Sequence, residues 1–233
     1  MKRSLIILSL LIYTYISQGQ AYNNLVSLDI KHQALKNKKL FTVNSQTLYN
    51  GKSEEVTSHY ISPTEFFKTI NNKGEVTLYL PKENTVSFSH NNHYSSKNEL
   101  IYYFVSNKTE DMGLKNDGFT VISSRNEKQN FIVTWKAPVN LNVVSEVDIV
   151  YENMVPIYSE YRELTGEIIK KIYYYDYYFG SAFNIPQKIT EISFVPNNDS
   201  IIKRTTVSNI KYGNNVDLKS FEFNIPSDAT KLD

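Results

Sequence analysis

Residues 75–80 read Glu-Val-Thr-Leu-Tyr-Leu, and this short stretch shows the pattern that decides the fold. Val76, Leu78 and Leu80 occupy alternate positions, so an extended chain places their side chains on one face. Pro81 follows directly and has no amide hydrogen with which to continue a strand. The stretch therefore predicts a β-strand over residues 75–80 with one apolar face.

The same alternation recurs on both sides of this strand. Asn50-Gly51, a dipeptide typical of hairpin turns, separates residues 40–49 from residues 53–61. The composition agrees, because 18 Tyr and 12 Phe suit a half-buried pleated surface. Further strands are predicted at 85–90, 119–123, 130–136, 145–152, 156–164, 167–179, 187–195, 201–212 and 220–225. Many strands in succession predict a sandwich or a barrel-like antiparallel sheet.

Residues 95–114 favour a helix instead. Ser96 and Glu99 have the spacing of a capping box, and Gly113 is suited to a helix end. An apolar stripe at helical spacing consists of Leu100, Tyr103 and Phe104. A short strand over residues 100–105 is the alternative, because Ile-Tyr-Tyr-Phe-Val also has high strand propensity.

Residues 23–39 are modestly helical in pattern. Leu25, Leu28 and Leu35 are spaced to share one helix face, although Asn and Lys dominate around them. We expect either a helix or a frayed leader there.

The first 19 residues have the features of a secretory signal peptide. The basic pair Lys2-Arg3 precedes an apolar run over residues 5–16, and Ser17-Gln18-Gly19 supplies small residues before a cut at Gln20. The alternatives are a cut after Ala21 and an uncleaved anchor. The apolar run is shorter than the roughly 20 residues of a transmembrane helix, which favours cleavage.

Cleavage leaves 214 residues (233 minus 19), which fit a single β-rich domain over residues 20–233. We expect this domain in the bacterial periplasm, with secretion or a surface location as alternatives. The formal net charge falls from +1 to −1 when Lys2 and Arg3 are removed. A near-neutral chain argues against nucleic-acid partners, and no basic run suits an anionic membrane surface.

The sequence contains no cysteine, which excludes disulfides, thiolate nucleophiles and a lipid-modified cysteine. His90 and His93 could approach a metal, but their spacing matches no zinc pattern. Asp176 lies within the aromatic run 173–179, where an acid could serve sugar binding or acid–base chemistry. In a regular strand it would share an exposed face with Tyr174 and Tyr178. The sequence therefore predicts no metal, no cofactor and no enzymatic activity.

The sheet needs a cover over its apolar face. A second sheet could close a dry core, or the sheet could curl into a half-barrel with Leu100, Tyr103 and Phe104 on a helical lid. In the second case the space beneath the lid would hold an apolar ligand. The candidate cavity residues are Val76, Leu78, Leu80, Val86, Phe88, Phe131, Val133, Trp135, Val147 and Ile149.

Four stretches resemble the LolA-like superfamily of periplasmic lipoprotein carriers and related lipid-binding domains. Residues 74–81, Gly-Glu-Val-Thr-Leu-Tyr-Leu-Pro, look like that family's early strand. Residues 185–189, with 208–212 and the Phe-Glu-Phe-Asn-Ile-Pro of 221–226, look like its closing strands. The resemblance covers about residues 74–228 and implies an open half-barrel with a helical lid over a cavity for acyl chains.

Two features depart from that family. Residues 40–70 are predicted to form an extra hairpin, and no arginine occurs between Arg3 and Arg125, where the family has a functional one. The sequence therefore indicates a divergent carrier for lipid or lipoprotein acyl chains in the cell envelope. The alternatives are an interaction protein that docks an envelope partner through exposed tyrosines of 173–179, and a secreted hydrolase using Asp176.

Overall fold

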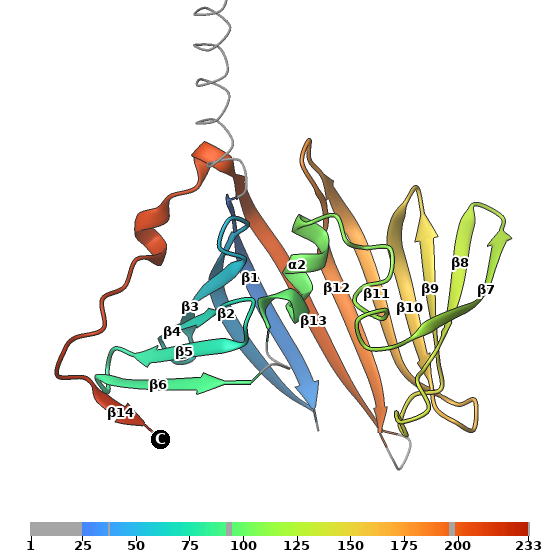
Figure 1. The fold of residues 1–233 in the computed structure, drawn as a ribbon, viewed down its shortest axis with the longest axis horizontal. Coiled ribbons are helices and arrows are strands. Elements are labelled where there is room, and N and C mark those ends of the chain that lie inside the picture. The colour runs from blue at the N-terminus through green and yellow to red at the C-terminus, as the bar shows by residue number, and fades with distance from the viewer. Residues whose placement is uncertain (1–24, 37, 92–94, 196–198, 233) are drawn as a thin grey trace, which may run out of the picture.

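Fourteen strands form one long, curved sheet whose two ends do not meet (Figure 1). The computed structural model describes residues 25–36, 38–91, 95–195 and 199–232. The strand order is β14-β6-β5-β4-β3-β2-β1-β13-β12-β11-β10-β9-β8-β7. The strands are β1 Leu25–Lys36, β2 Lys39–Asn50, β3 Glu55–Ser62, β4 Phe66–Ile70, β5 Glu75–Leu80, β6 Thr85–His90, β7 Thr120–Glu127, β8 Asn130–Lys136, β9 Glu146–Glu152, β10 Val155–Arg162, β11 Ile168–Phe179, β12 Asn184–Val195, β13 Asp199–Tyr212 and β14 Thr230–Leu232. The prediction of a mainly β, open half-barrel is confirmed.

Two antiparallel meanders, β1–β6 and β7–β13, make up the sheet. They join through the pairing of β1 with β13, where Val26 lies opposite Tyr212 and Leu35 opposite Ile202. The linker between the meanders carries the 3-10 helix η2 (Ser96–Asn98) and the helix α2 (Leu100–Val105). In Figure 1, α2 lies over the middle of the sheet, between the two meanders. We call the side of the sheet that faces α2 the inner face.

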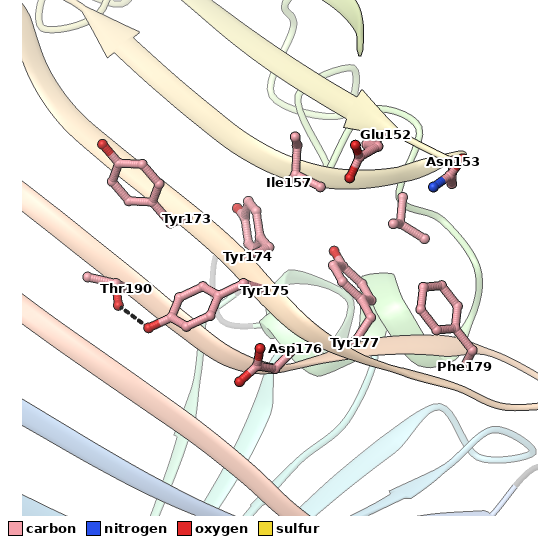
Figure 2. A pocket seen from close by; sticks show the side chains of 11 residues that line it. Glu152, Asn153, Ile157, Tyr173, Tyr174, Tyr175, Asp176, Tyr177, Phe179 and Thr190 are labelled. Atoms are coloured by element: carbon pink, nitrogen blue, oxygen red, sulfur yellow. Dashed lines mark hydrogen bonds between the residues drawn. The ribbon is translucent and has the colours of Figure 1, made fainter. Parts of the chain in front are cut away.

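β10 and β11 separate towards one end of the sheet. Their pairing runs only from Arg162–Ile168 to Tyr158–Tyr173, because β10 is irregular around Ile157 and Asp176 has a positive φ of 54°. Figure 2 shows Ile157 facing Tyr174 and Tyr177 across this divergence. The Tyr177 hydroxyl donates a hydrogen bond to the carbonyl of Pro156, and this bond links the two strands where they diverge.

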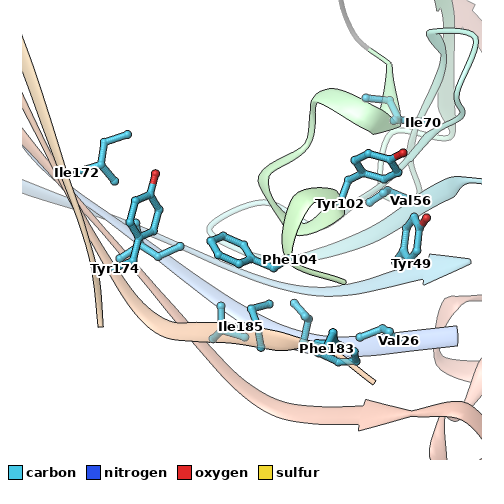
Figure 3. Close-up of a cluster of buried hydrophobic side chains, with 13 residues drawn as sticks. Val26, Tyr49, Val56, Ile70, Tyr102, Phe104, Ile172, Tyr174, Phe183 and Ile185 are labelled. Atoms are coloured by element: carbon cyan, nitrogen blue, oxygen red, sulfur yellow. The ribbon is translucent and has the colours of Figure 1, made fainter. Parts of the chain in front are cut away.

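The main hydrophobic core, which we call the inner core, lies between α2 and the inner face. Phe104 is 1% exposed, and its ring centre lies 5.9 Å from that of Tyr174 and 6.4 Å from that of Tyr177. Figure 3 shows Phe104 of α2 above Ile185, and Tyr102 of the same helix beside Val56 and Tyr49. A second cluster packs under the loop that follows α2 and contains Leu114, Phe119, Val133, Trp135, Val147, Ile149 and Tyr151.

The C-terminal segment covers the outer face of the first meander. Phe221 packs against Leu25 and Leu48, and the ring of Phe223 stacks on Phe67 at 4.6 Å. The chain then forms β14, which pairs in parallel with β6. The predicted strand over residues 220–225 is therefore wrong: this segment, with the 3-10 helices η3 (Gly213–Asn215) and η4 (Leu218–Phe221), lies across the sheet instead of within it.

The helical interpretation of residues 23–39 is also wrong, because residues 25–36 form β1. Leu25, Val26, Ser27 and Leu28 are all buried. The C-terminal segment covers one side of this strand, and α2 with the inner core covers the other. A strand buried on both faces shows no polar alternation, so its pattern is open to a helical interpretation.

The predicted helix over residues 95–114 is much shorter in the structure, although the alternative strand is excluded. Ser95 caps η2 through its side chain, whereas Glu99 caps α2 without a side-chain hydrogen bond, so the expected capping box does not form. The helix ends where Asn107 adopts a φ of 54°. The amides of Asn107 and Lys108 then bond to the carbonyls of Phe104 and Tyr103, the pairing of a Schellman helix end.

Candidate functional site

A pocket of about 100 Å³ lies between α2 and the inner face, and we call it the inner pocket. One part of its lining is apolar and consists of Leu28, Ile30, Val56, Leu100, Ile101, Phe104, Ile185, Ile189 and Val207. The other part is polar and consists of His32, Ser45, Thr47, Ser58, Tyr60, Glu99 and Thr205. The pocket is thus amphipathic, with residues from β1, β2, β3, β12 and β13 beneath a helical lid.

Strand register brings these side chains together. Ser45 lies opposite Tyr60 and Thr47 opposite Ser58 in the pairing of β2 with β3. Residues directly opposite in an antiparallel pair share a face, so all four point inward. The same rule places Ile30 beside Val207, and His32 beside Thr205, across β1 and β13. Residues 173 positions apart in the sequence therefore line one wall.

Two polar contacts lie in or beside the polar part of the pocket. His32 Nδ1 lies 3.0 Å from Thr205 Oγ1, and Lys68 Nζ lies 3.2 Å from a carboxylate oxygen of Glu99. Partial desolvation lowers the pKa of His32, while the nearby Glu99 carboxylate opposes that shift. Burial thus favours the neutral form of the His32 imidazole, and the Lys68–Glu99 pair supplies balanced charges.

The start of the lid is fixed to the β2–β3 loop. Ser96 is fully buried, and its hydroxyl donates a hydrogen bond to the carbonyl of Glu54 at 2.5 Å. Lys97 Nζ forms an ion pair with the carboxylate of Glu54 at 2.9 Å. The Ser96 amide also bonds to the carbonyl of Asn71. These contacts make the η2 end of the lid its anchored end.

We expect Ser96→Ala to lower the free energy of unfolding by about 1–2 kcal/mol, because a buried carbonyl loses its donor. Urea denaturation monitored by circular dichroism measures this change. The control is Ser124→Ala, since Ser124 is exposed on β7. A Ser96→Ala protein as stable as the control would show that the hydroxyl does not anchor the lid.

Two of the three predicted lid residues line the inner pocket. Leu100 and Phe104 do so, whereas Tyr103 packs against the inner core from outside the pocket lining. The structure thus places Leu100 and Phe104 over the inner face, in the wall of the pocket.

None of the ten predicted cavity residues lines the inner pocket. The second cluster contains four of them, Val133, Trp135, Val147 and Ile149. Phe131 is 44% exposed. On β5, Val76 packs against the inner core, and Leu78 and Leu80 alternate with it on the same face. Val86 pairs with Tyr79, which places Val86 and Phe88 on the outer face. A role for these residues in lipid binding remains a prediction.

Sequence reasoning missed the strand residues that line the pocket beneath the lid. Leu28 and Ile30 were hidden by the helical interpretation of β1. Ile189 and Val207 lie within strands that were predicted, but nothing in a single sequence says that β12 and β13 flank β1. Pairing information was the missing signal, because the pocket forms only where strands from both meanders meet.

A second, larger concavity lies where β10 and β11 diverge (Figure 2), and we call it the outer groove. Its volume is about 760 Å³. Its lining consists of Glu152, Asn153, Val155, Ile157, Tyr173, Tyr174, Tyr175, Asp176, Tyr177, Phe179 and Thr190. The predicted tyrosine run therefore forms most of one wall of a real depression.

The backbone bulge at Asp176 changes the expected alternation of the tyrosine run. Tyr174 and Tyr177 both pack towards the inner core, so Asp176 does not share a regular exposed face with Tyr174 and Tyr178 as predicted. The Asp176 carboxylate forms an ion pair with Lys188 at 2.6 Å, and both side chains are more than half exposed. This solvated pair lacks the environment that prepares a carboxylate for acid–base chemistry.

No metal-binding geometry is found in the part of the chain that the structure describes, where no three His, Cys, Asp or Glu side chains gather. His90 Nε2 hydrogen-bonds to the carbonyl of Lys73 at 2.9 Å, and His93 lies outside the described residues. The predicted signal peptide also lies outside them. Within the described residues, no helix is both long enough and apolar enough to span a bilayer.

An open, curved sheet with a helix over its inner face and a pocket between them defines a class of β half-barrel proteins. The chain has the LolA-like fold. It superimposes on a LolA superfamily protein from Nitrosomonas europaea with a TM-score of 0.54 and 10% identity, covering 86% of this chain and 91% of that one. The resemblance predicted from the sequence is thus confirmed for the fold.

Two further solved structures are similar. A putative outer membrane lipoprotein-sorting protein domain from Vibrio parahaemolyticus gives a TM-score of 0.55 at 8% identity, with 90% of this chain and 94% of that chain covered. A DUF1329 family protein from Desulfovibrio piger gives 0.56 at 11% identity, with 90% and 93% covered. No protein-family model and no curated protein sequence matches the chain.

Proposed function

We propose that this protein is a periplasmic carrier for lipid or lipoprotein acyl chains in the bacterial envelope. The observation that carries the proposal is the apolar part of the inner pocket, which lies on the inner face of an open sheet beneath the short helix α2. Burial of each methylene group contributes about 0.8 kcal/mol. An apolar pocket therefore provides affinity without catalytic residues, and we propose no enzymatic activity.

The inner pocket is too small to enclose an acyl chain with α2 in this position. Its volume of about 100 Å³ is well below the roughly 300–1,000 Å³ of pockets that enclose small-molecule ligands. An acyl chain requires α2 to move away from the sheet. Because α2 has only six residues and its η2 end is anchored, we propose that it swings about that end.

Native mass spectrometry of the mature protein, purified gently from a bacterial periplasm, tests the proposal. We expect extra masses that match lipids and that disappear on denaturation. We also expect delipidated protein to take up added monoacylglycerol or lipopeptide. A single bare mass together with no uptake of either probe would contradict the carrier function.

The outer groove supports a second candidate function, the docking of an envelope protein. Tyr173, Tyr175 and Phe179 line it and are respectively 39%, 40% and 65% exposed. Tyrosine provides a large contact area that is partly apolar and partly polar. A protein that takes up no lipid would make this groove the first surface to search for a partner.

A further inference from the structure

The inner pocket has a wall of buried hydroxyl groups. Ser45, Thr47 and Ser58 are 4%, 3% and 7% exposed, and all three line the pocket. They come from the adjacent strands β2 and β3, whose inward positions would normally carry apolar side chains in a dry core. We call these three residues the hydroxyl wall.

The hydroxyl wall has hydrogen-bonding capacity that the protein itself does not use. Thr47 Oγ1 and Ser58 Oγ lie 3.0 Å apart, so one of them donates to the other and the second keeps its own hydrogen free. No side-chain hydrogen bond joins Ser45 to another described residue, and its Oγ is not one of the fully enclosed unpartnered atoms, so the hydroxyl opens into the pocket. The wall therefore offers two unused donors in a buried setting.

A ligand that is only hydrocarbon fits this wall poorly. Such a ligand would exclude water from the hydroxyl groups and leave them unpaired, which weakens its binding. A carbonyl oxygen accepts two hydrogen bonds and donates none. It is thus complementary to two unused donors, while Leu28, Ile189 and Val207 provide an apolar path for an attached chain.

We propose that the hydroxyl wall binds the carbonyl group of an ester- or amide-linked acyl chain, so that the site selects acyl lipids over alkyl lipids. This inference rests on the proposed carrier function and names its ligand class. The carbonyl lies against Ser45, Thr47 and Ser58, and the chain extends beneath α2.

Three ligands with the same chain length test the selection. Dodecanoylglycerol has an ester carbonyl, the dodecanoyl amide of serinol has an amide carbonyl, and dodecylglycerol ether has neither. Isothermal titration of the mature protein should give a Kd roughly tenfold lower for the ester, the amide or both than for the ether. A preference for only one of the two carbonyl ligands would also support the proposal and would identify the linkage.

The variant Ser45→Ala/Thr47→Val/Ser58→Ala should remove the preference while ether binding is kept or improved. If the triple variant does not fold, Ser45→Ala alone replaces it in the test. This single variant should reduce the logarithm of the ratio of Kd values, ether over carbonyl ligand, by about half. Thr57→Val is the matched control, because Thr57 is 8% exposed on β3 but faces the outer side with Phe221. It should retain the full preference.

The outcomes separate this inference from the carrier function. Equal Kd values for the ester, the amide and the ether in the native protein would overturn acyl selection and leave the carrier function standing. An unchanged preference in the triple variant would overturn the assignment to the hydroxyl wall. Absence of binding by all three ligands would overturn the carrier function itself.

Discussion

Replacing Phe104 by alanine should lower the free energy of unfolding by about 3–5 kcal/mol, the range for removing a buried aromatic ring. Phe104 is 1% exposed and contacts the rings of Tyr174 and Tyr177. It is the side chain through which α2 is held against the second meander. Urea denaturation followed by circular dichroism measures the loss.

The matched control for this variant is Phe179→Ala. Phe179 is 65% exposed, so its replacement should change the free energy of unfolding by less than about 0.5 kcal/mol. A loss below about 1 kcal/mol in Phe104→Ala would show that α2 is not packed as the structure describes. In that case the pocket would be open before any ligand arrives.

Replacing Leu100 by aspartate should weaken acyl-chain binding on the order of tenfold to a hundredfold. Leu100 lines the inner pocket at the start of α2, and a carboxylate there must lose water when a chain enters. Because the side chain is 38% exposed in the unloaded protein, the fold should tolerate the charge. Isothermal titration with dodecanoylglycerol, alongside urea denaturation, separates binding from stability.

Leu141→Asp provides a control of the same chemistry. Leu141 is 37% exposed and lies in the loop between β8 and β9, outside the inner pocket. Its aspartate variant should bind dodecanoylglycerol as the native protein does. Equal binding by Leu100→Asp and the native protein would remove the inner pocket from the proposed function.

Local sequence pattern was sufficient for most of the strands. The predicted bounds of residues 75–80, 85–90 and 130–136 are those of β5, β6 and β8. Each of these strands alternates clearly and ends at a turn, so short-range information defines it. Residues 25–28 lack polar alternation because the C-terminal segment and the inner core bury both faces of β1. Residues 220–225 do alternate, with Phe221 buried and Glu222 exposed, but they pack across the sheet and pair with no strand.

The site was less accessible to sequence reasoning than the fold. The lid residues Leu100 and Phe104 were found because a helical stripe is a local signal. The strand residues beneath them were not, since they come from β1, β2, β3, β12 and β13, whose adjacency is set by pairing over long sequence distances. The relation of Val76 to Val86 shows the same limit: the four-residue connection over residues 81–84 places Val86 opposite Tyr79, and so on the other face.

The pairing of β1 with β13 also determines when the folded sheet can be completed. His32 meets Thr205 across 173 positions of sequence, and β14 pairs with the edge strand β6 from further along the chain still. Contacts of such sequence separation make folding slow, because a long loop must close before they form. During that interval each meander has an unpaired edge and an exposed apolar face, which is the state most prone to aggregation. The joining of β1 to β13 is therefore the step that removes these edges from contact with other chains.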